Sequence, residues 1–368
     1  MYRRRLIERE RAASYLFTML LAFALTILIT RLFLELSGYP QIGNEQLHIA
    51  HVLWGGLIAA VGATLPLIFA NTFVLEVSAA LIGAGLGLFF DEVGKFLTQN
   101  NDYFFRPAAS VIYVLFLLGV YVYITVRRGE PDAQTRLHHA LAAMQEIVDG
   151  DLDPQEKADL ERMLRATTRA EDAIPDVHEL AEALLVFVRE QADVVPARHT
   201  LLRDALRDAR CWVESTLLTR GVLRALLILS TALLGLLSLV DLAALLRGLG
   251  DPQQMSRLVQ GWAARASLTS GQEATWFVLM IGLKAVVGVA LLIALVQMLR
   301  GHEEQAILFA LAGLLLSIAA VNVLLFYFAQ FVAAAYATVD FLLIAALNFY
   351  RRRYLPATEA DRRSQRAP

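Results

Sequence analysis

Long apolar stretches are the feature that most constrains this chain, because a helix needs roughly 20 mainly apolar residues to cross the hydrocarbon core of a bilayer. Four such stretches precede residue 127 and four follow residue 220. They run from Ser14 to Leu36, His48 to Ala70, Phe73 to Phe90, Ala108 to Val126, Gly221 to Leu246, Ala274 to Leu299, Ala306 to Phe328 and Phe331 to Phe349. The sequence therefore predicts an all-α protein, a polytopic helical membrane protein with about eight transmembrane helices.

The composition supports the bilayer as the solvent of this chain. Its residues are 57% hydrophobic and only 18% charged, which is too apolar for an ordinary soluble domain. The division of the last apolar run into two spans rests on its length alone, because the join near Ala329 and Gln330 contains neither glycine nor proline.

The distribution of arginine predicts the orientation of the spans. Arginines gather at alternate ends of the spans, at Arg3 to Arg5, Arg127 and Arg128, Arg300, and Arg351 to Arg353. Since cationic loops stay on the cytoplasmic side, we expect both termini in the cytoplasm. Arginine greatly outnumbers lysine, which indicates a GC-rich genome, and we expect a bacterial inner (cytoplasmic) membrane.

The spans divide the chain into four predicted regions. Residues 1–126 form an N-terminal four-helix transmembrane region, residues 127–220 a cytoplasmic helical insert, residues 221–350 a C-terminal transmembrane region, and residues 351–368 a cytoplasmic tail. The insert is polar and predicts about four amphipathic helices. One should begin at Asp153, Pro154 and Glu156, and another at Asp176 with Glu179 three residues later.

The charge of the insert limits its partners. Acidic residues outnumber basic ones from residue 127 to residue 220, so binding to anionic lipid or to nucleic acid is not expected. Two interpretations remain open. The insert either docks a cytosolic protein partner, which would make the protein a non-enzymatic membrane scaffold, or it is a solvated helical linker without a ligand. The partners expected for the spans themselves are membrane lipids.

Small residues recur every four positions in the second and third spans, a pattern that allows close approach of helix backbones in lipid. The stripe in the second span is Gly55, Ala59 and Ala63, and its extension by helical steps reaches His51 and His48. The stripe in the third span is Ala79, Gly83 and Gly87, and the next step is Asp91. If the two stripes pack together, both histidines lie opposite Asp91 at the outer membrane boundary.

Histidines and carboxylates are ligands that Zn²⁺, Mn²⁺ and Fe²⁺ accept. The predicted ligands of such a divalent metal are His48, His51 and Asp91, with Glu92 or Asp102 as the general base. On this hypothesis the protein is a metal-dependent hydrolase or transferase of lipid-linked substrates. Two alternatives remain, a polar clasp in which histidine, Asp91 and Lys95 only fix the helix packing, and a proton or ion pathway.

A second polar set is predicted deeper in the later spans, where ionisable groups are costly and are expected to pair. Its members are Lys284, Asp340, Asn322 and Asp241, with Lys284 and Asp340 as the expected ion pair. This set suggests a secondary transporter or channel, and its alternative is a structural buried pair. The sequence leaves the enzyme, transporter and scaffold hypotheses open.

Several motifs that would identify other chemistries are missing from the sequence. It contains no Gly-x-Ser-x-Gly nucleophile elbow, no phosphate-binding glycine-rich loop and no dinucleotide fingerprint. The single cysteine, Cys211, excludes an intrachain disulfide. ATP-driven transport and nucleotide chemistry are therefore disfavoured.

The predicted orientation can be tested by cysteine labelling. A cysteine in place of Asn101, in a chain whose Cys211 is replaced by serine, should react with a membrane-impermeant maleimide added from the extracytoplasmic side. Labelling of this position from the cytoplasmic side alone would reverse the predicted topology.

Overall fold

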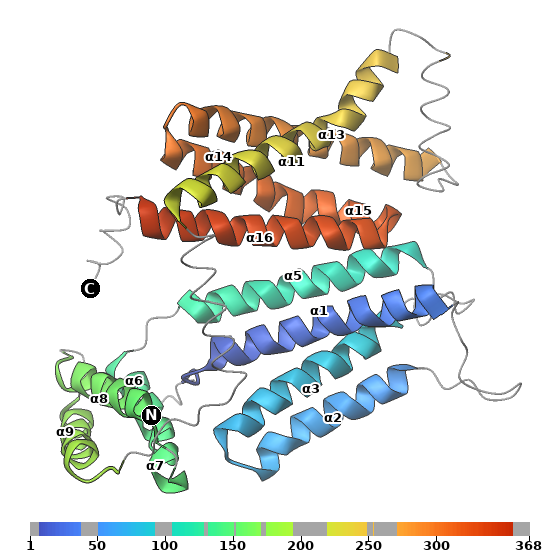
Figure 1. The fold of residues 1–368 in the computed structure, drawn as a ribbon. Coiled ribbons are helices and arrows are strands. Elements are labelled where there is room, and N and C mark those ends of the chain that lie inside the picture. Colours follow the sequence, from blue (N-terminus) through green and yellow to red (C-terminus); the bar gives the residue numbers. More distant parts are fainter. Residues whose placement is uncertain are drawn as a thin grey trace, which may run out of the picture. The chain divides into compact units, whose positions relative to one another are not determined.

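A computed structural model of the chain describes residues 7–37, 51–92, 105–128, 132–150, 152–170, 174–193, 219–248, 253 and 271–355. Every regular element in these ranges is helical, and none is a strand. The helices are α1 (Ala12–Ser37), α2 (His51–Ile68), α3 (Thr72–Asp91), α5 (Arg106–Arg128), α6 (Ala133–Ala143), α7 (Gln145–Asp149), α8 (Pro154–Thr168), α9 (Pro175–Glu190), α11 (Arg220–Gly248), α13 (Gly271–Leu299), α14 (Glu303–Leu316), the π-helix η1 (Ser317–Val321), α15 (Asn322–Phe328) and α16 (Gln330–Tyr354) (Figure 1). The predicted all-α fold class is confirmed.

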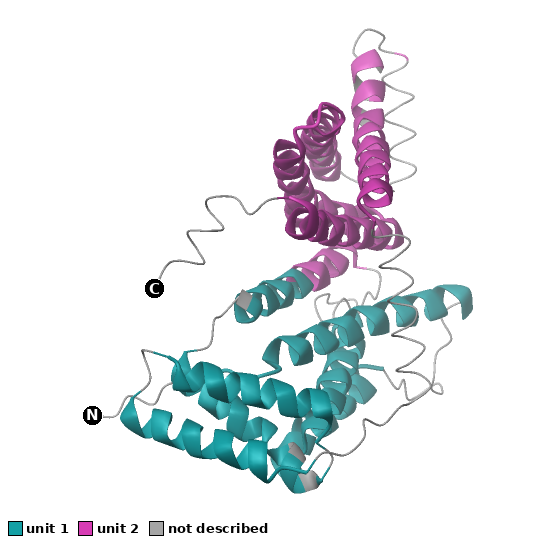
Figure 2. Cartoon of the chain, turned by 60° about the vertical axis from the view of Figure 1, so that its left-hand side comes forward, with its two compact units in different colours: residues 1–96, 115–200 teal, residues 97–114, 201–368 magenta. Residues whose placement is uncertain are grey.

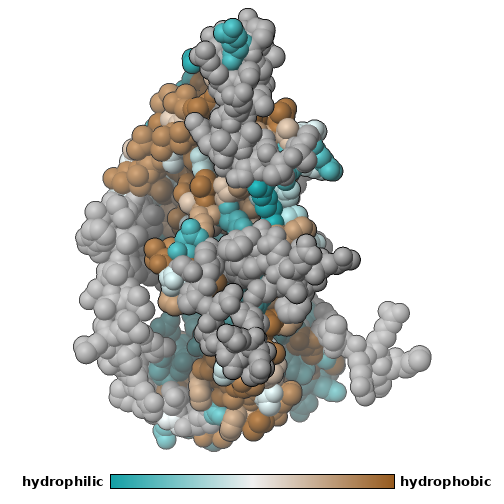
Figure 3. Space-filling model, turned by 90° about the vertical axis from the view of Figure 1, so that its right-hand side faces the viewer, coloured by the Kyte–Doolittle hydropathy of each residue, from teal (hydrophilic) through white to brown (hydrophobic). Residues whose placement is uncertain are grey.

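Eight helices of the described residues are long and apolar enough to cross a membrane, with α14, η1 and α15 forming one continuous span. Their outer faces carry large apolar side chains, such as Leu36 at 79% and Leu67 at 84% exposure. Apolar residues also make up much of the coloured part of the face drawn in Figure 3. Lipid can cover such a surface, whereas water would oppose it. The chain is a multi-pass helical membrane protein.

The predicted join between the last two spans is confirmed. Helix α15 ends at Phe328 and α16 begins at Gln330, with Ala329 between them at φ −153° and ψ 79°. The chain therefore turns at Ala329 without glycine or proline. The apolar run is too long for a single crossing, so a turn was expected here.

The chain divides into two compact units (Figure 2). Unit 1 contains Met1–Phe96 and Leu115–Thr200, and unit 2 contains Leu97–Val114 and Leu201–Pro368. Unit 1 therefore holds α1 to α3, the later part of α5, and α6 to α9. Unit 2 holds the beginning of α5 and the helices from α11 to α16.

In unit 1, helix α3 packs against both α1 and α2 (Figure 1). A Cβ atom added at Gly55 of α2 would lie 2.7 Å from the carbonyl oxygen of Gly85 and 2.7 Å from the backbone nitrogen of Phe89. In contrast, Gly83 and Gly87 of α3 lie against α1, where a Cβ at Gly87 would come within 2.9 Å of the Phe23 carbonyl oxygen.

The expected packing of the two small-residue stripes against each other is therefore wrong. The stripe with Gly83 and Gly87 faces α1, and α2 packs instead on the neighbouring face of α3 that contains Gly85. Ser78 belongs to the contact with α2 as well, since its hydroxyl donates to the Gly62 carbonyl oxygen at 2.6 Å. A helix such as α3, which packs against two others, needs two faces of small residues. The spacing of residues within that helix does not show which neighbour each face contacts.

The insert helices have a small core of their own, built around Leu137, Leu160, Leu164 and Ala181. The predicted start of α8 is confirmed, because Asp153 accepts from the Glu156 backbone nitrogen at 2.8 Å and Glu156 accepts from that of Asp153 at 2.8 Å. The predicted start at Asp176 is wrong by one position. Helix α9 begins at Pro175 after Ile174, and no side chain caps it.

Unit 2 is organised around a larger apolar core formed by α11, α13, α14 and α16. Leu227, Leu291, Leu314, Leu347 and Tyr350 are among its completely enclosed side chains. Helices α11 and α13 approach closely at Gly235 and Gly288, where a Cβ at Gly288 would lie 2.9 Å from the Gly235 carbonyl oxygen. Helices η1 and α15 pack on α13 and α16 and contribute Val321 and Leu325 to this core.

Adjacent glycines in α2 provide a matched test of the packing in unit 1. Gly55→Ala should destabilise the folded state by about 1 to 3 kcal/mol, because the new methyl group meets backbone atoms of α3 that cannot move aside. Gly56→Ala should change stability by less than about 0.5 kcal/mol, since nothing lies within 4 Å of its Cβ position. Unfolding in mixed micelles of increasing SDS content measures both, and equal effects would contradict this helix arrangement.

Candidate functional site

Four polar side chains meet where α2 begins and α3 ends, and we call Arg31, His51, Asp91 and Glu92 the Asp91 cluster. The Arg31 Nε lies 2.5 Å from Asp91 Oδ1, and His51 Nε2 lies 3.2 Å from Asp91 Oδ2. Asp91 and Glu92 are 1% and 0% exposed. The cluster thus joins α1, α2 and α3 through a buried carboxylate.

Glu92, the residue that follows α3, accepts a hydrogen bond from the backbone at the start of α2. Its Oε2 accepts from the Val52 backbone nitrogen at 2.9 Å and lies 3.6 Å from His51 Nδ1. The first N–H groups of a helix lack intrahelical partners and carry partial positive charge, so a carboxylate is favourable there. The His51 ring therefore lies within 3.6 Å of both carboxylates.

The predicted metal site is only partly within the described residues. His51 and Asp91 come together as expected, and Glu92 lies beside them. His48 and Asp102 lie outside the described residues, as does Lys95. In the ranges that are described, no group of three or more histidine, cysteine or acidic side chains could hold a metal ion. Sequence reasoning also missed Arg31 as a partner of Asp91.

Asp340, Ser317 and Asn322 form a second buried group, the Asp340 cluster, in unit 2. Asp340 of α16 is 2% exposed. Its Oδ2 accepts from the Ser317 hydroxyl at 2.7 Å and from Asn322 Nδ2 at 2.9 Å. Both donors are neutral. Sequence reasoning had placed Asp340 and Asn322 together and had missed Ser317, whose only signal is a hydroxyl inside an apolar span.

The π-helix η1 sets the positions of Ser317 and Asn322. The Asn322 N–H donates to the Ser317 carbonyl oxygen five residues earlier, so it does not form the bond to Ile318 that an α-helix would contain. The Tyr113 hydroxyl of α5 donates to the Ile318 carbonyl oxygen at 3.1 Å. Ser110, one turn earlier in α5, donates to the Val323 carbonyl oxygen at 2.8 Å. These hydroxyls stabilise an irregular backbone in an apolar region.

The expected ion pair between Lys284 and Asp340 is wrong. The contacts of Asp340 among the described residues are to Ser317 and Asn322, whereas the Lys284 ammonium lies 5.9 Å from the centre of the Tyr336 ring. The aromatic face attracts the cation at this distance. Asp241 belongs to α11, but its side chain lies outside the described residues.

Asp340 differs from the other buried acidic residues of the described ranges in its surroundings. Asp91 pairs with Arg31, and Glu92 lies beside His51. Glu303 lies 3.3 Å from an Arg220 nitrogen and 3.5 Å from an Arg224 nitrogen, and accepts from the Tyr350 hydroxyl at 3.0 Å. No cationic or histidine side chain of the described part of the chain pairs with Asp340.

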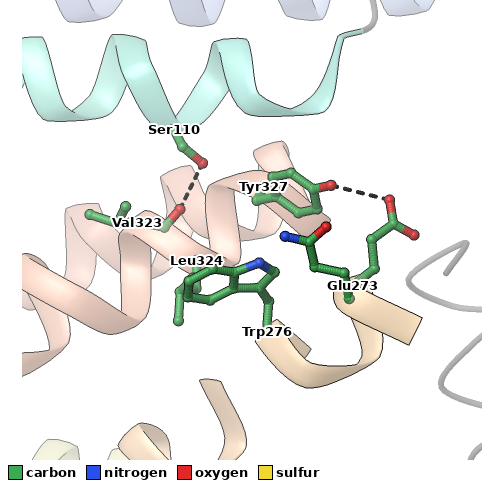
Figure 4. A pocket seen from close by; sticks show the side chains of 7 residues that line it. Ser110, Glu273, Trp276, Val323, Leu324 and Tyr327 are labelled. Carbon is green, nitrogen blue, oxygen red and sulfur yellow. Dashed lines mark hydrogen bonds between the residues drawn. The ribbon is translucent and has the colours of Figure 1, made fainter. Parts of the chain in front are cut away.

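A pocket of about 390 Å³ lies beside α15 in unit 2. It is lined by Ser110, Gln272, Glu273, Trp276, Val323, Leu324 and Tyr327 (Figure 4). The Tyr327 hydroxyl donates to Glu273 at 3.1 Å, and Arg106 lies 3.3 Å from the same carboxylate. The lining combines an indole ring and aliphatic side chains with hydroxyl, amide and carboxylate groups. Such a lining suits a solute that has both an apolar body and hydrogen-bonding groups.

Comparisons with known proteins yield no matching family model, no matching curated protein and no matching solved structure.

The Arg31 contact can be tested against an exposed ion pair of the same unit. Arg31→Met should destabilise the folded state by roughly 3 to 5 kcal/mol, because it removes the guanidinium that lies 2.5 Å from the enclosed Asp91 carboxylate. Arg11→Met, which breaks a pair to Glu76 that is about half exposed, should cost about 0 to 1 kcal/mol.

The double variant Arg31→Met, Asp91→Asn separates charge from lost contacts. It should recover much of the stability lost in Arg31→Met, since no buried charge is then uncompensated. SDS unfolding of all three variants gives the comparison. If the double variant is no more stable than Arg31→Met, the destabilisation comes from the lost contacts of the arginine side chain and not from an uncompensated charge.

Proposed function

We propose that the protein is a secondary transporter in which Asp340 binds the coupling ion. The observation that supports this most strongly is the enclosure of an acidic side chain within membrane-spanning helices, with two neutral hydrogen-bond donors as its partners. An ionised carboxylate in such a place costs several kcal/mol unless a cation or a proton accompanies it. A site that binds and releases a cation as the helices move is the basis of ion coupling.

The position of the Asp340 cluster beside an irregular helix also supports transport. π-helical turns are found frequently at functional sites, and irregular backbone within a membrane is tolerated where it is buried in protein or lines a water-filled cavity. Here one turn of η1 separates Ser317 from Asn322, so a change in the winding of this turn would move both donors relative to Asp340. Ion binding and helix geometry are thereby coupled.

Helix α15 connects the proposed ion site with the pocket. It begins at Asn322 of the Asp340 cluster, and its next residues, Val323 and Leu324, line the pocket together with Tyr327. A solute in the pocket would contact the same short helix that holds the ion. We propose that this pocket binds the transported solute, an amphipathic molecule with hydrogen-bonding groups.

The metal-dependent hydrolase or transferase has less support. The Arg31 Nε lies 2.5 Å from Asp91 Oδ1, and the positive charge of a guanidinium at this distance disfavours the binding of a divalent cation to the same carboxylate. Glu92 accepts a backbone N–H of α2 and has a structural role. The scaffold hypothesis rests on the insert, whose described helices have a separate core but show no further feature that points to a partner.

Transport can be tested in liposomes that contain the purified protein. A potassium diffusion potential, negative inside, should drive proton entry, measured by a trapped pH dye, or uptake of radioactive sodium. We expect one of these fluxes to exceed that of protein-free liposomes and to fall at least tenfold in Asp340→Asn.

Thr338→Ala is the matched control for this experiment. Thr338 lies on the same helix two residues away, but its side chain is exposed and, among the described residues, bonds to the Ala334 carbonyl oxygen of its own helix. Its flux should equal that of the wild type. Equal fluxes in the wild type and Asp340→Asn, or a wild-type flux no larger than that of empty liposomes, would refute the proposed function.

A further inference from the structure

We infer that the Asp340 cluster is a binding site for a dehydrated monovalent cation of the size of Na⁺. This inference rests on the proposed function and names its coupling ion. The three side chains supply a carboxylate, a hydroxyl oxygen and an amide oxygen, which are the ligand types that hard cations prefer.

The missing hydrogen-bond partner of the Asn322 amide oxygen indicates that the cluster binds a ligand. Asn322 is 0% exposed, and its Oδ1 has no hydrogen-bond partner, although its Nδ2 donates to Asp340 at 2.9 Å. A buried acceptor without a partner costs about 1 to 3 kcal/mol, so native structures rarely leave one. A cation would supply the missing partner.

A proton explains the arrangement less well than a cation. Protonation of Asp340 would neutralise the carboxylate, but in the observed amide orientation it would leave Asn322 Oδ1 without a partner. A cation bound by both side chains would satisfy the carboxylate and the amide oxygen together. Asn322 Oδ1 therefore distinguishes the two occupants.

The charge of the cluster selects a monovalent ion. Asp340 is its one acidic member, so a monovalent cation gives a neutral site, whereas a divalent cation would leave an uncompensated positive charge among apolar side chains. The hydroxyl of Ser317 and the amide of Asn322 are neutral, so they supply oxygen ligands without adding charge.

The arrangement of the backbone agrees with an ion-dependent state. Ser317 and Asn322 stand at the two ends of the π-helical hydrogen bond, since the Asn322 N–H donates to the Ser317 carbonyl oxygen. A cation that joins their side chains to Asp340 would tie η1 to α16. Loss of the cation would free this segment, which continues into the pocket-lining helix α15.

Thermal unfolding of the purified full-length protein tests for the ion directly. NaCl should raise the unfolding temperature in a saturable manner relative to equal concentrations of choline chloride, because an ion that binds only the folded state stabilises it by mass action. KCl should act more weakly. Ser317→Ala should raise the half-saturating NaCl concentration at least tenfold, and Asn322→Ala should do the same if it folds.

Asp340→Asn should abolish the sodium effect, and Thr338→Ala should preserve it. Identical unfolding temperatures in NaCl, KCl and choline chloride would overturn the inference, as would an unchanged NaCl dependence in Ser317→Ala. In liposomes, a proton flux that requires Asp340 but does not change with the sodium concentration would refute the sodium site and remain consistent with the proposed transporter. If neither the proton flux nor the sodium flux depends on Asp340, both the sodium site and the proposed transporter are refuted.

Discussion

A buried carboxylate in a membrane helix needs a positive or hydrogen-bonding partner, and this requirement determines how the helices of each unit are joined. In unit 1, Arg31 of α1 reaches the Asp91 carboxylate at the end of α3, and Glu92 provides an acceptor for the start of α2. In unit 2, Asp340 of α16 holds η1 and α15 through two neutral donors. Apolar packing alone has little preference between helix partners in lipid, so these polar contacts make the arrangement specific.

Close backbone approach makes such contacts possible in unit 1. The two faces of α3 serve different neighbours, with Gly83 and Gly87 against α1 and Gly85 against α2. Asp91 lies one helical step beyond Gly87 and therefore continues the face toward α1, where Arg31 is found. The same carboxylate still reaches His51 of α2 because it stands at the end of the helix. Glycine packing and charge pairing thus support the same arrangement.

Unit 2 combines a regular apolar core with one irregular segment. The core side chains of α11, α13, α14 and α16 are closely enclosed, whereas η1 interrupts the α-helical hydrogen bonding beside Asp340. The Tyr113 hydroxyl of α5 donates to the Ile318 carbonyl oxygen of η1, and the Ser110 hydroxyl donates to the Val323 carbonyl oxygen of α15. π-helical turns are found frequently at functional sites. We propose that ion binding changes the winding of this turn.

The sequence by itself determined the class of fold, the number of spans in the described residues and most of the span limits to within three residues, because hydrophobic length is a local property. It also identified His51, Asp91, Asn322 and Asp340 as unusual, since polar groups in apolar spans are costly wherever they occur. The tertiary structure decided which groups meet. Arg31 is a partner of Asp91, and Ser317, not Lys284, donates to Asp340. Such pairings depend on helix rotation and on a π-helical turn, and neither follows from the spacing of residues along one helix.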